Sequence, residues 1–200
     1  MIRGNATIIM CPYCGTEKEL MTLMTGNTFG AKFWSDNKCL APMLPRVSPV
    51  QKCPHCGKYY FEHKQEHKRG DGCSMDQGNL NYFEWKEAYE QFLEEDTEKE
   101  DMNIVRLHLI QSYNDFVYRN MESNFVSFII NEYIRSHIWV ETQDFLLKAE
   151  LHREANEMEQ CAATLSIIDQ KNLDDCERKV FEDIKERMKK GDSKVFLLEF

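Results

Sequence analysis

Two short cysteine motifs carry the clearest chemistry in the sequence. They read CPYCG at Cys11–Gly15 and CPHCG at Cys53–Gly57. The two-residue gap lets both thiolates of a tight turn point at one ion, and the glycine after the second cysteine permits the positive φ that such a turn usually needs. Two such turns within 47 residues predict one tetrahedral site. Its expected ligands are the four cysteines of the motifs: Cys11, Cys14, Cys53 and Cys56.

The ion that we expect in this site is one structural Zn²⁺. The chain has eight cysteines and no secretory signal at its start, so metal binding is a better explanation than a disulfide framework. A closed site of four thiolates leaves no position for water, which argues against catalysis by the ion. A CPxCG pair also resembles rubredoxin, an iron protein of electron transfer, so iron stays an alternative. Here 38 residues lie between Cys14 and Cys53, and a longer helical part follows.

Other reactive side chains have less regular spacing. Four of them could form a second metal site, or could be free thiols and exposed histidines: Cys39, Cys73, His63 and His67. Either of these cysteines beside a histidine could also be a nucleophile pair, which leaves an enzyme with an unrecognised site as an alternative. Cys161 and Cys176 lie on apolar helical stripes and are expected in the core.

Composition divides the chain near residue 80. Residues 1–80 hold 10 Lys and Arg against 7 Asp and Glu, and residues 81–200 hold 15 against 27, so the net charges are +3 and −12. All five prolines and eight of the nine glycines lie in the first part. We therefore predict an α+β protein, with a small β-rich zinc-ribbon domain over residues 1–79 and a mostly α-helical domain over residues 80–200.

The expected strands flank the cysteine motifs. Thr7–Met10 should lead into the first motif, Val50–Lys52 into the second, and Tyr59–Phe61 should leave it. Between the motifs, Thr28–Trp34 could be a strand, and the run to Pro49 should be extended and irregular. The aromatic residues of these segments are expected to pack, and any that stay exposed would be candidates for ligand stacking: Phe29, Trp34, Tyr59, Tyr60 and Phe61.

Five or six helices are expected after residue 80. Apolar residues recur at steps of three and four over residues 102–117, 121–133 and 173–188. The last helix has a plausible cap at Asn172 and ends before Gly191, and the acidic run from Glu94 to Asp101 should be a helix end with an exposed connection. The apolar tail Val195–Phe200 should dock on the helices or contact a second subunit.

The motifs and the segment between them resemble the N-terminal region of a group of uncharacterised bacterial proteins, which join a zinc ribbon to a tetratricopeptide-like helical region. The likeness rests on CPYCG, GNTFGAKFWSDNK, APMLP and CPHCG, and it is strongest over residues 11–61. Residues 145–156 with 157–165 are similar to one helix–turn–helix unit of that kind, with Asn156 where a turn glycine is usual. The resemblance implies a TPR-like bundle and no known activity. No 34-residue self-similarity supports a regular repeat array.

These features favour a non-enzymatic, zinc-binding protein that acts through protein–protein interaction, as a module or adaptor in a reducing bacterial cytoplasm. Nucleic-acid binding is the alternative, through a basic stretch beside aromatic residues: Lys52, Lys58, Lys64, Lys68 and Arg69. The net charge of −9 argues against it. Catalytic motifs of common enzymes are absent from the sequence, and neither a membrane span nor a basic amphipathic helix is present.

Overall fold

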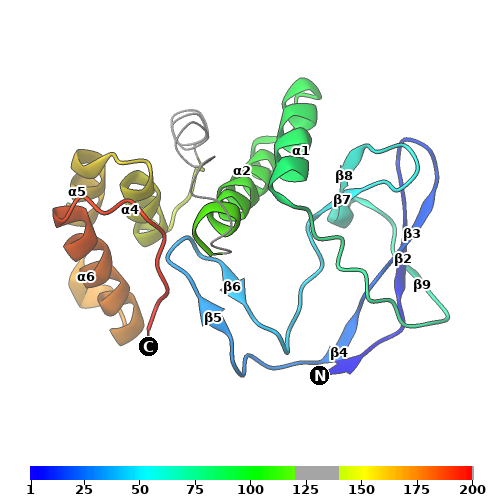
Figure 1. Cartoon of the computed structure of the whole chain (residues 1–200), viewed down its shortest axis with the longest axis horizontal. Helices are drawn as coiled ribbons and strands as arrows, with labels where there is room; N and C mark the ends of the chain where they lie inside the picture. The colour runs from blue at the N-terminus through cyan, green and yellow to red at the C-terminus, as the bar shows by residue number, and fades with distance from the viewer. Residues whose placement is uncertain (120–139, 200) are drawn as a thin grey trace. The chain divides into compact units, whose positions relative to one another are not determined.

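The computed structural model describes residues 1–119 and 140–199. The chain forms two compact units, drawn in Figure 1. One, here called the cysteine unit, consists of Met1–Ala31 and Leu40–Val105; the other, the helical unit, consists of Lys32–Cys39 and Arg106–Phe200. Residues 80–105 thus belong with the cysteine motifs, and a short segment between the motifs belongs with the helices. The domain boundary between residues 79 and 80 stays a prediction.

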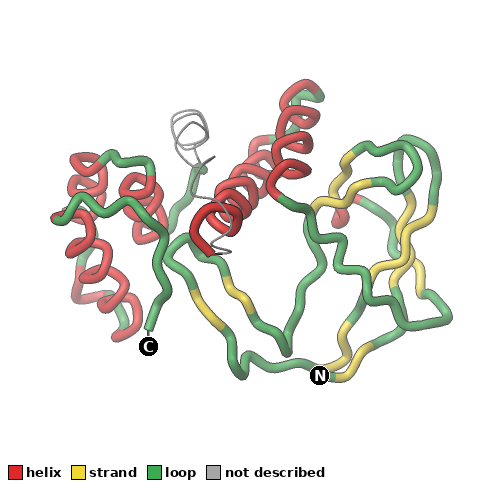
Figure 2. The backbone as a smooth tube through the Cα atoms, viewed as in Figure 1, coloured by secondary structure: helices red, strands yellow, loops and turns green. Residues whose placement is uncertain are grey.

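The cysteine unit is built on short antiparallel strands, shown in yellow in Figure 2. Its strands are β1 (Ile2–Arg3), β2 (Thr7–Met10), β3 (Glu17–Leu20), β4 (Leu23–Thr25), β7 (Val50–Lys52), β8 (Tyr59–Phe61) and β9 (Lys68–Arg69). They form three small sheets, with the orders β3-β2-β9, β7-β8 and β1-β4. The three strands predicted beside the motifs are confirmed, because β2, β7 and β8 have the expected bounds.

The strand predicted over Thr28–Trp34 is much shorter than expected. Only β5 (Lys32–Phe33) forms there, and it pairs with β6 (Cys39–Leu40). The preceding residues turn instead, because the Asn27 side chain accepts a hydrogen bond from the Phe29 N–H and Gly30 has a positive φ of 71°. Residues 41–49 are irregular, as predicted.

Two helices complete the cysteine unit. Helix α1 (Tyr82–Glu94) begins with a capping box, in which Asn81 and Glu84 each bind the other's backbone N–H, and it buries Trp85, Ala88 and Phe92. Helix α2 (Lys99–Asn114) begins in this unit and ends in the helical unit. A short 3₁₀ turn, η1 (Glu62–Lys64), follows β8. The predicted connection within the acidic run is therefore confirmed between α1 and α2, whereas Asp101 lies inside α2 and is buried.

The helical unit is a small bundle. After α2 come a π-helical turn, η2 (Asp115–Arg119), then α4 (Phe145–Glu154), α5 (Met158–Ser166), a 3₁₀ turn, η3 (Gln170–Asn172), and α6 (Asp175–Lys189). Helices α4, α5 and α6 pack together (Figure 1) around apolar side chains: Ala149, Cys161, Leu165, Phe181, Ile184 and Phe196. The described residues contain five α-helices, in agreement with the prediction, and the stripe predicted over residues 121–133 lies outside them.

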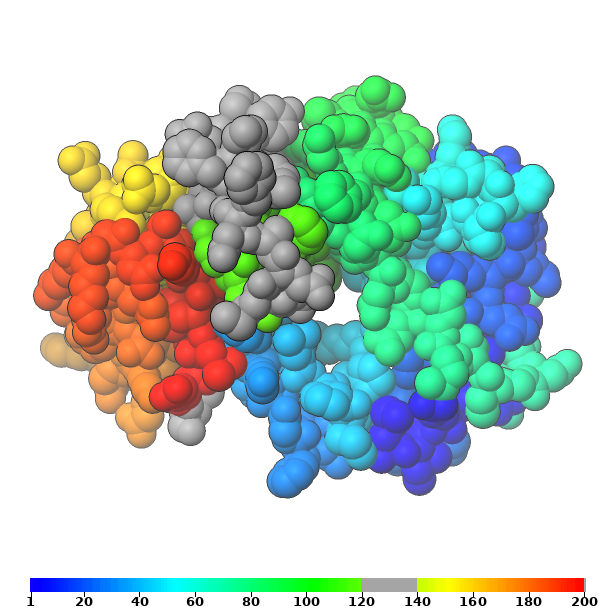
Figure 3. All heavy atoms as spheres, in the orientation of Figure 1, coloured from blue at the N-terminus to red at the C-terminus, as the bar shows by residue number. Residues whose placement is uncertain are grey.

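The C-terminal tail docks on these helices, which is the first of the two predicted possibilities. Phe196 lies in the core of the helical unit, and the Leu198 side chain packs against that core. Leu197 also forms an antiparallel bridge with Trp34, which brings the segment 32–39 into the same unit. In Figure 3 the last residues of the chain, in red, lie against the orange atoms of α6.

Two details of α6 differ from the sequence interpretation. The N-cap is Asp174, which forms a capping box with Glu177, whereas Asn172 lies in η3. The buried side of the helix is centred on Phe181 and Ile184, so Cys176 is exposed rather than part of the core. Cys161 is buried as predicted.

Helices α4 and α5 form the predicted helical hairpin. Asn156, between them, has a φ of 63°. Glycine adopts this left-handed conformation most readily, and asparagine adopts it more readily than most other residue types. This explains how asparagine replaces the usual turn glycine. The tetratricopeptide-like character of the bundle stays a prediction.

Buried polar groups link the segment Lys32–Cys39 to the helices of the helical unit. The Asn114 amide donates hydrogen bonds to Asp36 Oδ2 at 3.0 Å and to Glu154 Oε2 at 2.9 Å. Arg119 forms an ion pair with Asp36. Both carboxylates are buried, and none of the residues that the structure describes forms a hydrogen bond with the other oxygen of Glu154, Oε1.

A second buried pair holds the C-terminal segment. Arg153 and Glu150, one helical turn apart on α4, form an ion pair with both side chains fully buried. Arg153 Nη2 also donates to the carbonyl of Lys194 at 2.9 Å, and Arg153 donates to the carbonyl of Asp192. The guanidinium group is therefore fully engaged, which is the condition under which a buried charge is tolerated.

Candidate metal centre

Each cysteine motif forms a turn between two strands, and the two turns have the same hydrogen bonds. In the first, the Cys11 N–H donates to the Thr16 carbonyl and the Gly15 N–H donates to the Cys11 carbonyl, both at 2.9 Å. In the second turn, the Cys53 N–H donates to the Lys58 carbonyl at 2.9 Å and the Gly57 N–H donates to the Cys53 carbonyl at 3.1 Å. The two glycines have φ values of 73° and 74°, as the motifs predict.

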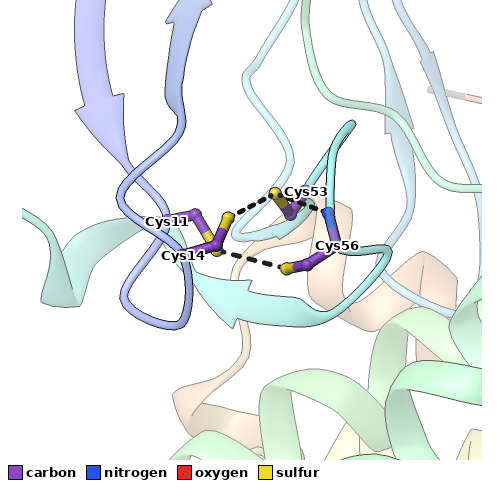
Figure 4. A group of neighbouring side chains, drawn as sticks. All are labelled: Cys11, Cys14, Cys53 and Cys56. Carbon is purple, nitrogen blue, oxygen red and sulfur yellow. Dashed lines mark hydrogen bonds between the residues drawn. The ribbon is translucent and has the colours of Figure 1, made fainter.

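The two turns bring four thiol groups together. Figure 4 shows the side chains of Cys11, Cys14, Cys53 and Cys56 pointing toward one another from the two loops. Their sulfur atoms all lie within 4.8 Å of one another, with 3.5 Å between Cys14 and Cys53 and 3.7 Å between Cys11 and Cys56. A tetrahedron with Zn–S bonds of about 2.3 Å has sulfur–sulfur edges of about 3.8 Å. The geometry therefore fits one ion with four thiolate ligands.

The four thiols have unlike surroundings. Cys11 and Cys53 are buried, whereas Cys14 and Cys56 are exposed. Burial raises the pKa of Cys11 to about 12. Hydrogen bonds from the Thr16 hydroxyl and backbone lower the pKa of Cys14 to about 5, which favours its thiolate. Since metal ligation requires thiolates, the buried Cys11 needs the charge of a cation most.

Apolar groups surround the buried side of this four-cysteine group. Ile9, Leu20 and Tyr60 form one buried cluster with Cys11 and Cys53. Burial, and then the negative charge of the cysteines, raises the pKa of Tyr60 well above its ordinary value, so this side chain stays a neutral phenol. Such a shell limits the access of water to the inner side of the site.

The last turn of α1 contacts both cysteine turns. The Gln91 side chain accepts the Tyr59 N–H at 3.0 Å and donates to the Tyr59 carbonyl at 2.8 Å, directly after the second turn. It also donates to the hydroxyl of Tyr13, which lies between the two cysteines of the first turn, at 3.1 Å. The Tyr13 hydroxyl donates in turn to the Glu95 carboxylate, at 2.9 and 3.0 Å from its two oxygens.

Further contacts attach α1 to β7 and β8. Lys52 lies 3.3 Å from Glu84 and 3.5 Å from Glu87, and the Tyr59 hydroxyl donates to Glu87 at 2.6 Å. The ring of Phe61 stacks on that of Phe92, with centroids 4.4 Å apart. The tyrosine and phenylalanine side chains of β8 are all buried, so these candidates for ligand stacking pack instead.

The other candidate ligands do not join a metal group. Among the residues that the structure describes, the four-cysteine group is the one set of three or more His, Cys, Asp or Glu side chains placed to hold an ion. His63 lies 3.3 Å from the Asp101 carboxylate, and His67 lies 3.2 Å from that of Glu62. Cys39 is half-buried in the helical unit and Cys73 is exposed in the cysteine unit.

The basic residues of the alternative interpretation are partly paired. Lys52 contacts acidic residues of α1, and Lys64 contacts Asp101 and Glu98 of the segment that begins α2. The Lys58 ammonium lies 4.5 Å from the centroid of the Tyr13 ring. Lys68 and Arg69 lie on β9, where both are exposed. Nearby carboxylates thus neutralise two of the five charges.

The two motifs predict the group of four cysteines but not the residues that contact its two turns. Tyr13 stands inside the first motif, yet its contact with Glu95 spans 82 positions. Gln91 lies on the helical face between buried residues, and nothing in its neighbourhood distinguishes it from a solvated glutamine. Only the packing of α1 on the strands reveals its function.

No family model, curated protein or solved structure matches this chain. In the described part of the chain, none of the helices has the length and apolar character that crossing a bilayer requires.

Proposed function

We propose that the chain binds one Zn²⁺ ion through Cys11, Cys14, Cys53 and Cys56, and that the ion has a structural role. The observation that carries this is the convergence of four sulfur atoms within 4.8 Å of one another from two turns of the same design. Four thiolates complete the coordination of the ion, so its chemistry here is to cross-link the two turns rather than to activate water. Iron would use the same ligands, and metal analysis separates the two ions.

Elemental analysis of the purified full-length protein tests this proposal. We expect about one zinc per chain, and a Cys53→Ser variant that retains none. Cys176→Ser is the matched control, because Cys176 is exposed on α6 and lies outside the four-cysteine group. Full zinc content in Cys53→Ser would refute the site, and a rust-red protein with one iron per chain would replace zinc with iron.

We further propose that this metal-stabilised protein works by binding another protein. Support comes from large apolar side chains that the cysteine unit leaves exposed: Ile2, Met24, Phe29 and Met43. Phe29 is 85% exposed and Met24 is 73% exposed. The segments that carry these residues adjoin, because β1 pairs with β4 and the Asn27 N–H donates to the Met43 carbonyl at 3.2 Å. Large apolar side chains exposed on adjoining segments are typical of interaction sites.

A comparison of surface variants tests this second proposal. The full-length protein should capture one stoichiometric protein partner from its native source, and a Met24→Ser/Phe29→Ser variant should lose it while it keeps its zinc. Met75→Ser is the control, since Met75 is 63% exposed in a loop of the same unit. Equal capture by all three proteins would exclude this surface. Recovery of nucleic acid in place of protein would favour the alternative, which the pairing of Lys52 and Lys64 does not support.

A further inference from the structure

We propose that the last turn of α1 is a positioning element of the metal site, in which Gln91 and Glu95 hold the two cysteine turns at the spacing that the ion needs. This inference rests on the proposed binding of zinc. Gln91 and Glu95 lie outside the cysteine motifs and would nevertheless affect metal affinity. The residues act through Tyr13 and Tyr59 and do not touch the ion's ligands themselves.

The first step is that strand pairing does not fix the two turns relative to each other. The first turn joins β2 to β3, and the second joins β7 to β8. Among the strands that the structure describes, these pairs belong to separate sheets. The turns therefore need other links, and the shared ion is one of them.

The second step is that α1 supplies such a link. The Gln91 amide binds the backbone of Tyr59 on the second turn's side and the hydroxyl of Tyr13 on the first. Glu95, one turn further along, accepts from the same hydroxyl. One side-chain bridge thus spans both cysteine turns without any metal ligand in it.

The third step is energetic. A link that holds the turns together before the ion arrives reduces the entropy that metal binding must remove, so it raises metal affinity. By thermodynamic linkage, the ion must stabilise the bridge by the same factor. The earlier turns of α1 contact β7 and β8 through Glu84 and Glu87, so we expect the effect of the ion to concentrate in the last turn of the helix.

Zinc affinity of full-length variants, measured by competition with a chromophoric chelator, tests the proposal. Tyr13→Phe removes only the hydroxyl of the bridge and should lower the affinity two- to tenfold; Gln91→Ala should lower it roughly tenfold or more. Tyr89→Phe and Glu94→Ala are the matched controls on the same helix and should stay within twofold of the original protein. Tyr13→Phe and Gln91→Ala break the same bridge. The factor by which the double variant loses zinc affinity should therefore be smaller than the product of the two single factors.

Hydrogen exchange provides a readout that a general loss of helix stability would not give. Removal of zinc should reduce the amide protection of residues 91–95 more than that of residues 82–88, and should leave α6 unchanged. In Gln91→Ala this difference between zinc-loaded and zinc-free protein should shrink. Wild-type affinity in Tyr13→Phe and Gln91→Ala, or equal protection of the last turn with and without zinc, would overturn the inference while metal binding stands. Absence of any metal from the native protein would overturn both.

Discussion

The two units of this chain are stabilised by different means. In the cysteine unit, two of the four proposed ligands, Cys11 and Cys53, are part of a buried cluster with Ile9, Leu20 and Tyr60. The cluster of the helical unit consists of apolar side chains from α4, α5, α6 and the C-terminal segment. The two cysteine turns of the first unit lie in separate small sheets, so a metal ion bound by both would cross-link them, and the described residues of the second unit hold no such group.

Net charge, by contrast, does not distinguish the two units. Residues 1–80 carry a net positive charge and residues 81–200 a net negative one, yet the cysteine unit holds 10 basic and 15 acidic residues and the helical unit 15 and 19. The net charges of −5 and −4 are nearly equal because residues 81–105, with 9 acidic and 2 basic side chains, belong to the cysteine unit. Charge along a chain therefore describes surfaces only after the packing is known.

Removal of the metal has the largest expected effect and divides the two units. Chelation should lower the unfolding temperature of the cysteine unit strongly without abolishing its transition, because the Gln91 bridge and the buried cluster also link the two turns. The helical unit should unfold as before, because the described residues place no metal group in it. Scanning calorimetry with and without chelator measures both transitions. An equal fall of both would show that the units do not differ in this way.

Arg153→Ala should have the next largest effect, and on the other unit. It leaves the Glu150 carboxylate buried without its partner, which should destabilise the helical unit by about 3–5 kcal/mol. Zinc content should not change. Urea unfolding gives the difference, with Arg178→Ala as control, because the Arg178–Asp175 pair on α6 is exposed and should be worth less than about 1 kcal/mol. A small effect of Arg153→Ala would mean that the apolar core alone suffices.

Glu154 should make the stability of the helical unit depend on pH. Burial, and then the charges of Glu150 and Asp36, raises the pKa of Glu154 well above its ordinary value of 4.5. The folded chain therefore holds this proton more tightly than the unfolded chain, and stability should fall as pH rises above 4.5. Glu154→Gln should remove this loss and stabilise the unit by about 1 kcal/mol at pH 8, with little difference at pH 4.

Urea unfolding at the two pH values measures this effect. Glu159→Gln is the control, because Glu159 lies on the exposed side of α5. A Glu154→Gln variant that is less stable than the original protein at pH 8 would show that the charged carboxylate is favoured where it stands. Zinc affinity should be unaffected by either substitution.

The smallest expected effect concerns the turn between α4 and α5. Asn156→Ala should destabilise the helical unit by about 1 kcal/mol, because a Cβ without the asparagine amide is disfavoured at a φ of 63°. Asn156→Gly should stay within about 0.5 kcal/mol, since glycine adopts this conformation freely. Thermal unfolding of the two variants compares them. A glycine variant as unstable as the alanine variant would indicate that the asparagine side chain itself matters.

The metal site could be predicted from the sequence because its geometry is local. Each CPxCG turn orients its own two thiols, and flanking β-branched and aromatic residues predict the strands on either side. Only the meeting of the two turns needs the tertiary fold. By contrast, the Asn114–Asp36 hydrogen bond joins residues 78 positions apart, and no local pattern indicates it.

The errors in α6 have a related cause. Apolar residues at steps of three and four define a stripe but not which neighbouring position faces the core. Cys176 belongs to such a stripe, yet the packed side of the helix is centred on Phe181 and Ile184. Asn172 and Asp174 are both good caps, and the reciprocal bond with Glu177 decides for Asp174. The sequence narrows the candidates for the buried residues and for the N-cap, and the packing of the helix determines which of them is used.

The hydrogen bonds between Gln91 and Tyr59 also bear on solubility. Among the described strands, β8 pairs with β7 alone, so the N–H and carbonyl of Tyr59 on its other side resemble the open sheet edge to which another chain can add a strand. The Gln91 amide satisfies both groups and occupies that place. A single side chain thereby protects the most aromatic strand of the molecule against intermolecular β-pairing, and so against aggregation.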